Sequence, residues 1–279
     1  MTRLKAQTRI DHFHNLVTHW SHFGPPLRPS AADTRVIAQI ARQLPGEARV
    51  VMLGVTPETA ACGFQPGTRL LSLDHSLAMI SALWGVEGAP ASAHAVGADW
   101  GAMPLVSGLI DAVVGDGCYA LFPYPSGYRA LTREVHRVLR PGGKLAMRTY
   151  VRPEPAESVE SIETAYRAGA ISSVHALKLR LWAALHGASG EGACLADVWA
   201  AWRKFPRIDA IAEGRPGWSA GELEGIESYR SLRARYHLTT VSECHAVLLE
   251  RFERVDWFWT DDESSDRSPT FVAHKGQRA

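Results

Sequence analysis

The sequence predicts an α/β fold in which helices cover both faces of a doubly wound, seven-stranded, mostly parallel sheet. The first observation is that short apolar runs alternate with helical patterns between residues 35 and 151. This alternation is typical of parallel strands joined by right-handed crossovers. The second observation is that residues 254–260 and 270–274 read as strands and are joined by a short polar loop. They predict an antiparallel hairpin that completes the sheet at the C-terminus.

The stretch ARVVMLGVTPET, residues 48–59, reads as the first strand, a tight turn and the start of a helix. Its apolar run is typical of a central strand that is covered on both faces. Gly54 follows where the chain turns and where a ligand can approach the backbone. Thr56 suits the N-cap of the next helix, Pro57 its first position and Glu58 the positive end of its dipole. The pattern indicates a site for a small polar ligand, although an ordinary strand-to-helix turn has the same features.

Acidic and aromatic residues follow the next two predicted strands. The strand at residues 68–74 ends in Asp74, and a weaker strand at residues 92–96 is followed by Asp99 and Trp100. Ligands of open α/β sheets bind beyond the carboxyl ends of the strands, where Asp74 can accept hydrogen bonds from both ribose hydroxyls. Asp99 can bind an adenine amino group, and Trp100 can cover the ring. Asp74 is equally consistent with an N-cap or a surface acid.

The remaining units of the core repeat the order of strand and helix. The fourth strand runs into Gly115, Asp116 and Gly117, whose glycines indicate close approach of the backbone to a ligand. The helix after it ends at a Pro-Gly-Gly turn, and a fifth strand follows. The predicted helices of the core are residues 32–44, 77–84 and 126–139, and these two strands are residues 110–114 and 144–151.

Residues 152–238 contain four helical patterns and are far longer than a usual connection, so we expect an inserted helical cap. Its tryptophans either line a substrate pocket or pack the core of the cap, which is the commoner role of a tryptophan. These are Trp182, Trp199, Trp202 and Trp218. The chain therefore divides into an N-terminal helical segment over the pocket (1–31), a cofactor-binding α/β core (32–151), the cap (152–238), and a C-terminal helix and hairpin (239–279).

The composition of the 279 residues is that of an ordinary globular protein, with a formal net charge of +1. This charge gives no electrostatic reason to expect a nucleic acid or an anionic membrane as a partner. The four cysteines are far apart, and the sequence has no run of about 18 apolar residues and no signal-peptide pattern. We therefore expect a cytoplasmic protein.

Four histidines near the N-terminus, His12, His14, His19 and His22, raise the question of a metal site. No carboxylate or cysteine stands nearby at a familiar ligand spacing. We therefore expect histidines near a pocket mouth and no bound metal.

Taken in series, these segments resemble the class I S-adenosylmethionine-dependent methyltransferases, and in particular their small-molecule branch. REVHRVLRPGGKLAMR, residues 133–148, is similar to the family's helix, Pro-Gly-Gly turn and fifth strand. VVMLGVTPET, SLDHS, GADWGAMPL and IDAVVGDG look like its first motif, the acidic end of its second strand, its adenine-contact loop and its fourth strand. The first motif diverges, because Met52 replaces the usual acid and Thr56 and Glu58 replace glycines.

The resemblance implies a Rossmann-like methyltransferase that uses S-adenosylmethionine as cofactor. Asp74 would hold the ribose, Asp99 with Trp100 the adenine, and the turn after Gly54 the amino-acid portion. The expected cofactor-binding residues are Gly54, Val55, Thr56, Pro57, Asp74, His75, Asp99, Trp100, Gly115 and Asp116. On the acceptor side we expect Asp116 and Tyr119 as catalytic groups and His19, Trp20, Arg28 and Tyr124 as substrate-binding groups.

The expected reaction is methyl transfer to a small molecule, with Arg28 available to pair with a substrate carboxylate. The sulfonium already activates the methyl group, so much of the rate can come from alignment and from excluding water. A general base is needed only for an acceptor that reacts in a protonated form. We expect a monomer or homodimer whose partner is the methyl acceptor.

Three other functions are weighed against this one. A non-catalytic binding or scaffold protein that retains the sheet is credible because of the altered turn. An NAD-dependent oxidoreductase is disfavoured because GVTPET lacks the GxGxxG pattern. A nucleic-acid methyltransferase is disfavoured because the chain has no basic run and no Asn-Pro-Pro-Tyr-like element.

Overall fold

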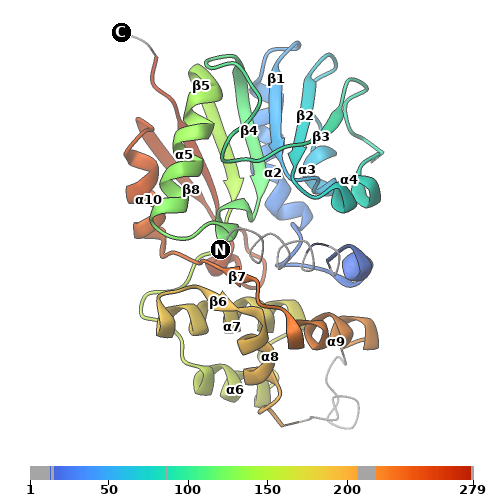
Figure 1. The fold of residues 1–279 in the computed structure, drawn as a ribbon, viewed down its shortest axis with the longest axis vertical. Helices are drawn as coiled ribbons and strands as arrows, with labels where there is room; N and C mark the ends of the chain where they lie inside the picture. Colours follow the sequence, from blue (N-terminus) through green and yellow to red (C-terminus); the bar gives the residue numbers. More distant parts are fainter. Residues whose placement is uncertain (1–12, 14–15, 86, 207–217, 278–279) are drawn as a thin grey trace.

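The computed structural model describes residues 13, 16–85, 87–206 and 218–277. An α/β sandwich and a helical cap are stacked along the long axis of the molecule (Figure 1). The sheet has seven strands in the order β3-β2-β1-β4-β5-β9-β8, and its last two strands are antiparallel to their neighbours, which confirms the predicted fold class. The strands are β1 (Arg49–Leu53), β2 (Arg69–Asp74), β3 (His94–Gly97), β4 (Ile110–Asp116), β5 (Leu139–Arg148), β8 (Arg254–Phe258) and β9 (Thr270–His274).

The parallel pairing brings the carboxyl ends of five strands to one edge of the sheet. At the centre, Met52 of β1 pairs with Ser72 of β2 on one side and with Val114 of β4 on the other. The strand order runs outward from β1 in both directions, so the loops after β1 and β4 diverge and leave a crevice between them. The cap lies against this edge, as Figure 1 shows.

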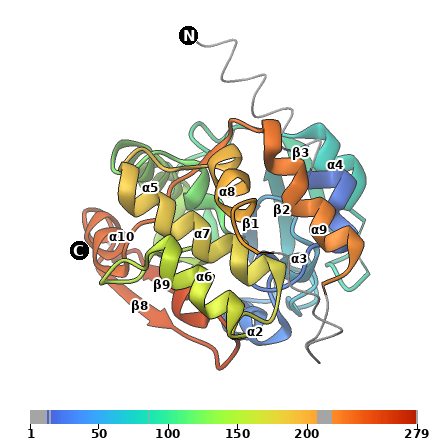
Figure 2. The ribbon, with the colours of Figure 1, turned by 90° about the horizontal axis from the view of Figure 1, so that it is seen from below.

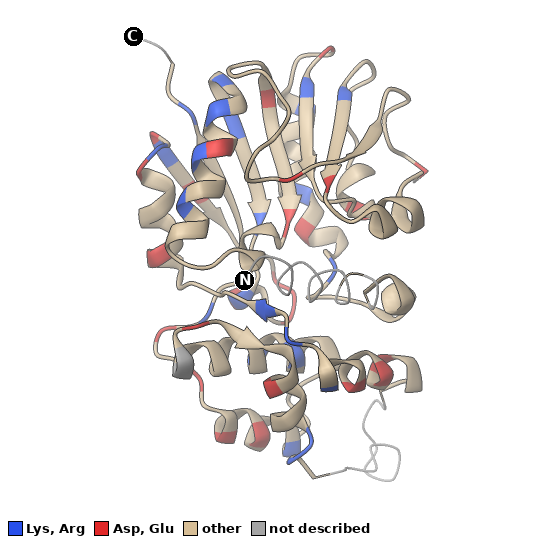
Figure 3. Ribbon diagram, in the orientation of Figure 1, with Lys and Arg blue, Asp and Glu red and all other residues tan. Residues whose placement is uncertain are grey.

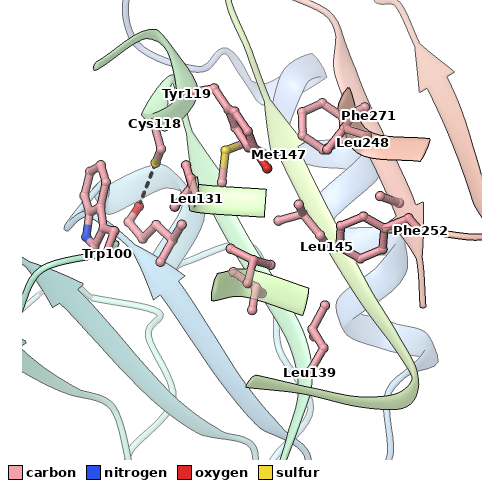
Figure 4. Close-up of a cluster of buried hydrophobic side chains, with 14 of the residues drawn as sticks. Trp100, Cys118, Tyr119, Leu131, Leu139, Leu145, Met147, Leu248, Phe252 and Phe271 are labelled. Atoms are coloured by element: carbon pink, nitrogen blue, oxygen red, sulfur yellow. Dashed lines mark hydrogen bonds between the residues drawn. The ribbon is translucent and has the colours of Figure 1, made fainter. Parts of the chain in front are cut away.

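Alternate residues of the strands pack on opposite faces of the sheet, as the period of two requires. Val51 and Leu53 join the cluster formed with α5 and α10, part of which is shown in Figure 4. Val50 and Met52 join the cluster formed with α2 and α3. The helices of the sandwich are α2 (Ala31–Gln43), α3 (Pro57–Ala60), α4 (Leu77–Leu83), α5 (Ser126–Val138) and α10 (Val241–Leu249).

Some boundaries differ from the predicted ones. Strand β5 begins at Leu139 and not at Lys144, because the Pro-Gly-Gly segment is paired: the Gly142 N–H donates to the carbonyl of Lys275 at 3.1 Å. The helix that opens after Thr56 is a single turn. Thr56 is at the N-cap, but its side chain makes no capping hydrogen bond. Pro57 occupies the first helical position, as predicted.

Among its described residues the cap has four helices. They lie across the carboxyl edge of the sheet (Figure 2). Each of the four helical patterns predicted between residues 152 and 238 forms a helix. The structure adds a short antiparallel pair, β6 (Ala193–Cys194) with β7 (Arg235–Tyr236), which was not predicted because two-residue strands have no readable alternation. The helices are α6 (Val159–Arg167), α7 (Val174–Ser189), α8 (Leu195–Trp202) and α9 (Ala220–Glu227), and the 3-10 turn η3 (Ser228–Ser231) follows α9.

The described residues of the N-terminal segment lie between the sandwich and the cap (Figure 1). Of the N-terminal helical segment predicted over residues 1–31, Phe13 and residues 16–31 are described, and residues 16–22 end in the 3-10 turn η1 (Trp20–His22). The rest of that segment, with His12 and His14, lies outside the described residues. Ser30 then begins α2 through a capping box with Asp33.

Charged residues of both signs are dispersed over the sandwich and the cap (Figure 3). The dispersion agrees with the formal net charge of +1. In the described parts of the chain, every helix is too short or too polar to cross a bilayer.

Candidate functional site

A pocket lies between the carboxyl edge of the sheet, the N-terminal segment and the cap. Its empty volume is about 750 Å³ when the space open to solvent is included. The wall formed by the strand ends includes Gly54, Val55, Thr56, Asp74, Trp100 and Asp116. The opposite walls are rich in aromatic side chains, including Phe23, Tyr150, Trp182, Tyr229 and Tyr236.

Three strand ends converge at Gly54. Its φ of +89° favours glycine, as the sharp turn after β1 requires. The Gly54 N–H donates to the carbonyl of Leu73 at 2.8 Å, and Nε1 of Trp100 donates to the same carbonyl at 2.5 Å. A Cβ placed on Gly54 would lie 3.8 Å from Cζ2 of Trp100 and 4.0 Å from Oδ2 of Asp74. The bare backbone of Gly54 therefore faces an indole and a carboxylate.

Asp74 is a buried carboxylate, 4% exposed, at the end of β2. Its Oδ1 accepts a hydrogen bond from the Ser76 N–H at 2.8 Å, and Oδ2 is directed toward Gly54. Burial raises the pKa of Asp74 from 3.8 to about 6, and the bond from Ser76 opposes this shift. An acid kept this far from water is suited to a ligand that donates hydrogen bonds to it.

Asp116, at the end of β4, is held by Arg148 at the end of β5. Nε and Nη2 of Arg148 donate to the two oxygens of Asp116 at 2.6 and 3.1 Å, and Arg148 is only 1% exposed. Burial raises the pKa of Asp116, while the guanidinium opposes that shift. Asp116 lines the pocket and both of its carboxylate oxygens are bonded to Arg148, and its expected catalytic role stays a prediction.

Arg148 also attaches the N-terminal segment to the sheet. Its Nη1 donates to the carbonyl of Pro26 at 2.7 Å and lies 3.7 Å from Oδ2 of Asp33. Nearby, the Tyr150 hydroxyl donates to the carbonyl of Leu27 at 3.2 Å. These contacts place residues 26 and 27 against the strand ends, where they close one side of the pocket.

An ion pair between Arg28 and Glu58 is the second contact that attaches the N-terminal segment to the sandwich. Nε of Arg28 donates to Oε1 of Glu58 at 2.9 Å, and the guanidinium lies 4.8 Å from the ring centroid of Trp20. Arg28 is thus paired within the chain, and its expected binding of a substrate carboxylate stays a prediction. Trp20 does line the pocket, as expected.

Tyr119 is a residue of the hydrophobic core. Its ring packs edge-on against Phe271, as Figure 4 shows, and its hydroxyl is 2.9 Å from Oγ1 of Thr132. It is fully buried, and burial raises its pKa. The expected catalytic role of Tyr119 is therefore replaced by a packing role.

Several other expected site residues lie beside the pocket and not in its described lining. Gly115 provides room for the core, because a Cβ there would lie 2.8 Å from Cε of Met147. Oδ1 of Asp99 accepts from the Gly101 N–H at 2.8 Å and so closes an exposed turn. His75 packs edge-on against Trp100 at 6.4 Å. The others outside this lining are His19, Pro57 and Tyr124.

The aromatic wall is centred on Trp182 of α7. Its ring stacks on Tyr236 with centroids 4.3 Å apart and an interplanar angle of 9°. Tyr150 meets it edge-on at 6.0 Å, and Tyr229 lies nearly parallel to it at 6.4 Å. Among the four tryptophans considered in the sequence, Trp182 lines the pocket, and the described lining does not include Trp199, Trp202 or Trp218.

Sequence reasoning missed five aromatic residues of the described lining, which are Phe13 and the four considered next. Tyr150 follows the fifth strand, so the rule that ligands bind at strand ends could have found it. Tyr229 lies in a 3-10 turn and Tyr236 in a two-residue strand, and neither element has a sequence pattern. Phe23 precedes the turn at Gly24, and no signal in the sequence indicated that it meets the cap.

The described side chains include no group of three His, Cys, Asp or Glu arranged to hold a metal ion. His12 and His14 lie outside the described residues. The candidate site is therefore described by its carboxylate, its backbone turn and its aromatic walls.

The fold and the strand-end geometry define the class: this is the Rossmann-like methyltransferase fold. The chain is similar to a SAM-dependent methyltransferase from Methanosarcina mazei, with a TM-score of 0.50 and 14% identity over 86% of this chain and 98% of that one. It is also similar to phosphoethanolamine N-methyltransferase 2 from Haemonchus contortus in complex with phosphomonomethylethanolamine and S-adenosylhomocysteine, with a TM-score of 0.52 and 12% identity over 99% of this chain and 59% of that one.

A third similar structure is a provisionally named zinc-dependent alcohol dehydrogenase from Rhodobacter sphaeroides, with a TM-score of 0.55 and 13% identity over 95% of this chain and 98% of that one. No protein-family model matches the chain, and no curated protein matches its sequence. At these sequence identities the similarities show a shared fold, and the activity has to be argued from the residues of the site.

Proposed function

We propose that this protein is an S-adenosylmethionine-dependent methyltransferase that acts on a small molecule. The observation that carries the proposal is the convergence of Gly54, Asp74 and Trp100 where the strand order diverges, at one end of an aromatic-walled pocket. An open backbone turn, a buried carboxylate and an indole are suited to the polar and aromatic parts of an adenosyl cofactor. The shared fold of solved methyltransferases supports the same reading.

The residues present fit the ribose end of the cofactor best. Oδ2 of Asp74 lies beside the bare backbone of Gly54, so in this proposal it accepts hydrogen bonds from the ribose hydroxyls. Trp100 covers one face of the adenine. The turn from Gly54 to Thr56 holds the amino-acid portion, whereas Glu58 is engaged by Arg28.

The cofactor would supply a methyl group that its sulfonium has already activated. The chain would contribute alignment and the exclusion of water, for which the stacked rings of Trp182 and Tyr236 form a rigid apolar wall. At the acceptor end of the described lining, the carboxylate of Asp116 is paired with Arg148. The site therefore suits an acceptor that is already deprotonated when it reacts.

Thermal unfolding with S-adenosylhomocysteine is the direct test of cofactor binding. A ligand at 100 times its dissociation constant stabilises a protein by about 2.7 kcal/mol. For a chain of this size we expect the melting temperature to rise by about 5–10 °C. NAD at the same concentration serves as the control. Curves that overlay the ligand-free curve with S-adenosylmethionine and S-adenosylhomocysteine, together with a shift by NAD, would contradict the proposal.

The variant Asp74→Asn is expected to weaken S-adenosylhomocysteine binding by about 10- to 100-fold, because it removes a charged hydrogen-bond acceptor. Without ligand the variant should be more stable than the wild type at about pH 8. The reason is that a buried acid with a raised pKa destabilises the fold where it is ionised, above about pH 6, and this penalty is lost as the pH falls toward 3.8.

Calorimetric titration and thermal scans at two pH values measure the two effects of Asp74→Asn. Asp261→Asn is the matched control, because Asp261 is exposed and outside the described lining, so we expect both quantities to stay unchanged. Unchanged affinity in Asp74→Asn would remove Asp74 from the site.

A non-catalytic protein with the same fold would not turn over the cofactor, and this distinguishes it from a methyltransferase. A methyltransferase releases S-adenosylhomocysteine when a suitable acceptor is present. A screen of metabolites for this release therefore identifies the acceptor and tests catalysis together. Tight cofactor binding without release by any acceptor class would favour the non-catalytic alternative.

A further inference from the structure

Two polar nitrogen atoms are buried on one face of α7 without a hydrogen-bond acceptor. They are Nζ of Lys178 and Nε1 of Trp182, one helical turn apart, and neither has a partner among the described residues. Lys178 is 0% and Trp182 is 2% exposed. Native proteins rarely leave such donors unsatisfied. Trp182 also lines the pocket, so this unpartnered N–H belongs to the pocket wall.

The walls around Trp182 are flat and apolar. Tyr236 stacks on its ring, Tyr150 meets it edge-on, and Tyr229 and Phe23 complete the described aromatic lining of the cap side. Aromatic faces at this density favour another flat ring, which they bind by offset stacking and edge contacts. The shape of the wall thus selects planar molecules over branched aliphatic ones.

A buried lysine lies next to this wall and is charged below its lowered pKa of about 7. Nζ of Lys178 lies 4.4 Å from the ring centroid of Phe23 and 4.9 Å from that of Tyr229, and both rings line the pocket. Lys178 is outside the described lining and contacts two rings that belong to it. In its charged form it opposes a second cation at these rings.

The carboxylates nearest to this end of the pocket are already engaged. Asp116 is paired with Arg148, and Glu222 of α9 caps its own helix through Ser219 and lies 3.9 Å from Nε2 of His175. Asp74 lies at the cofactor end. A cationic substrate would therefore meet aromatic rings with a lysine next to them, and the described carboxylates nearest to this half already accept hydrogen bonds within the chain.

We propose that the methyl acceptor is a planar aromatic molecule, neutral or anionic, with an oxygen that accepts a hydrogen bond from Nε1 of Trp182. This inference rests on the proposed function, because it names the class of molecule that receives the methyl group. The oxygen satisfies the buried indole N–H, the ring packs against Tyr150 and Tyr229, and Lys178 favours negative charge on the ligand.

The test uses three probes with one ring system and different charge: 2-naphthoate, 2-naphthol and 2-naphthylmethylammonium. Each is titrated calorimetrically at about pH 6, below the pKa of Lys178, into the full-length protein, with and without S-adenosylhomocysteine. We expect 2-naphthoate and 2-naphthol to bind and the ammonium probe to bind at least about tenfold more weakly, which corresponds to 1.4 kcal/mol. Equal or tighter binding of the ammonium probe, or no binding of any probe, would overturn the inference.

The same titrations separate this inference from the proposed function. Binding of S-adenosylhomocysteine without binding of any naphthalene probe would overturn the acceptor class and leave methyl transfer in place. Binding of 2-naphthoate without binding of S-adenosylhomocysteine would overturn the methyltransferase proposal and support the described ligand chemistry of the aromatic wall.

Two tryptophan variants test the role of the indole N–H. Trp182→Phe retains an aromatic ring and removes a donor that has no partner, so we expect about tenfold weaker 2-naphthoate binding. Trp199→Phe is the matched control, because Nε1 of Trp199 donates to Glu227 at 2.9 Å outside the described lining. It should lower the melting temperature and leave 2-naphthoate affinity unchanged. Unchanged affinity in Trp182→Phe would contradict the assigned hydrogen bond.

A third variant tests the charge next to the wall. Lys178→Met keeps the length of the side chain and removes the nitrogen. We expect it to reduce the preference for 2-naphthoate over 2-naphthylmethylammonium by about threefold or more. An unchanged preference would show that Lys178 does not contribute to the selection of the ligand charge.

Discussion

Replacing Arg148 with methionine is expected to lower the free energy of unfolding by about 3–5 kcal/mol. The guanidinium is 1% exposed and bonds to both oxygens of Asp116 and to the carbonyl of Pro26, with Asp33 at 3.7 Å. Methionine fills much of the volume but leaves two buried carboxylates without a cation. Removing one partner of a buried pair costs more than the pair contributes, because the remaining charge is uncompensated.

Arg140→Met is the matched control for this prediction. Nε of Arg140 donates to Oδ1 of Asp111 at 2.6 Å, the same distance as in the buried pair, but the Arg140 side chain is 40% exposed. An exposed pair of this kind contributes about 0–1 kcal/mol. Urea unfolding measures both variants. Equal losses would show that pairing, and not burial, sets the effect.

The double variant Arg148→Met with Asp116→Asn extends the test. If the loss in Arg148→Met comes from the uncompensated charge of Asp116, removing that charge should restore part of the stability. A double variant no more stable than Arg148→Met would assign the loss to the other contacts of the guanidinium, with Pro26 and Asp33.

Replacing Lys178 with methionine is expected to raise the free energy of unfolding by about 3–5 kcal/mol at pH 6. Nζ of Lys178 is buried without a hydrogen-bond partner in the described structure. Folding therefore removes a polar amine from water. Below its pKa the group is an ammonium ion, and the free-energy cost of removing it from water is larger. A methionine of similar length keeps the packing against Phe23 and Tyr229 and has no charge to desolvate.

The effect of Lys178 on stability depends on pH in a defined direction. Burial lowers its pKa from 10.5 to about 7, and the charge of Glu222 opposes this shift. Between these values the unfolded chain binds more protons than the folded one, so the stability of the wild type rises with pH. The advantage of Lys178→Met is therefore complete below about pH 7 and disappears above 10.5. His175, the neighbouring base on α7, has a pKa of about 4 and stays neutral across this window.

Urea unfolding of the wild type and of Lys178→Met at about pH 6, 8 and 10 measures the difference in this window. Lys204→Met is the control, because Lys204 is exposed and should change stability little at any of these pH values. A difference for Lys178 that stays constant with pH would show that the side chain does not titrate in the fold as described.

The sheet was predictable because its signals are local. The apolar run at residues 50–53 and the glycine after it appear in adjacent residues, and so does the acid that ends residues 68–74. The rule that parallel strands place their carboxyl ends at one edge then brings Gly54, Asp74 and Trp100 together without further information. These residues line the pocket as expected.

The partners of the charged residues were not predictable, because each pair joins distant segments. Arg148 meets Asp116 from 32 positions away, and Arg28 meets Glu58 from 30. The expected roles of Asp116 and Arg28 assumed that both side chains were available to a substrate. The fold instead satisfies each charge internally, as burial of an ion demands.

The amino-acid order thus sufficed for the architecture and for the strand-end part of the site, since periodicity and glycine or proline positions act over a few residues. The aromatic part of the pocket wall is formed where distant segments of the chain pack together. Tyr119 went into the core, whereas Tyr150, Trp182, Tyr229 and Tyr236 came together from the sheet and the cap. Which aromatic residue faces a pocket and which fills the core depends on the surfaces that meet it, and those surfaces exist only after the chain has folded.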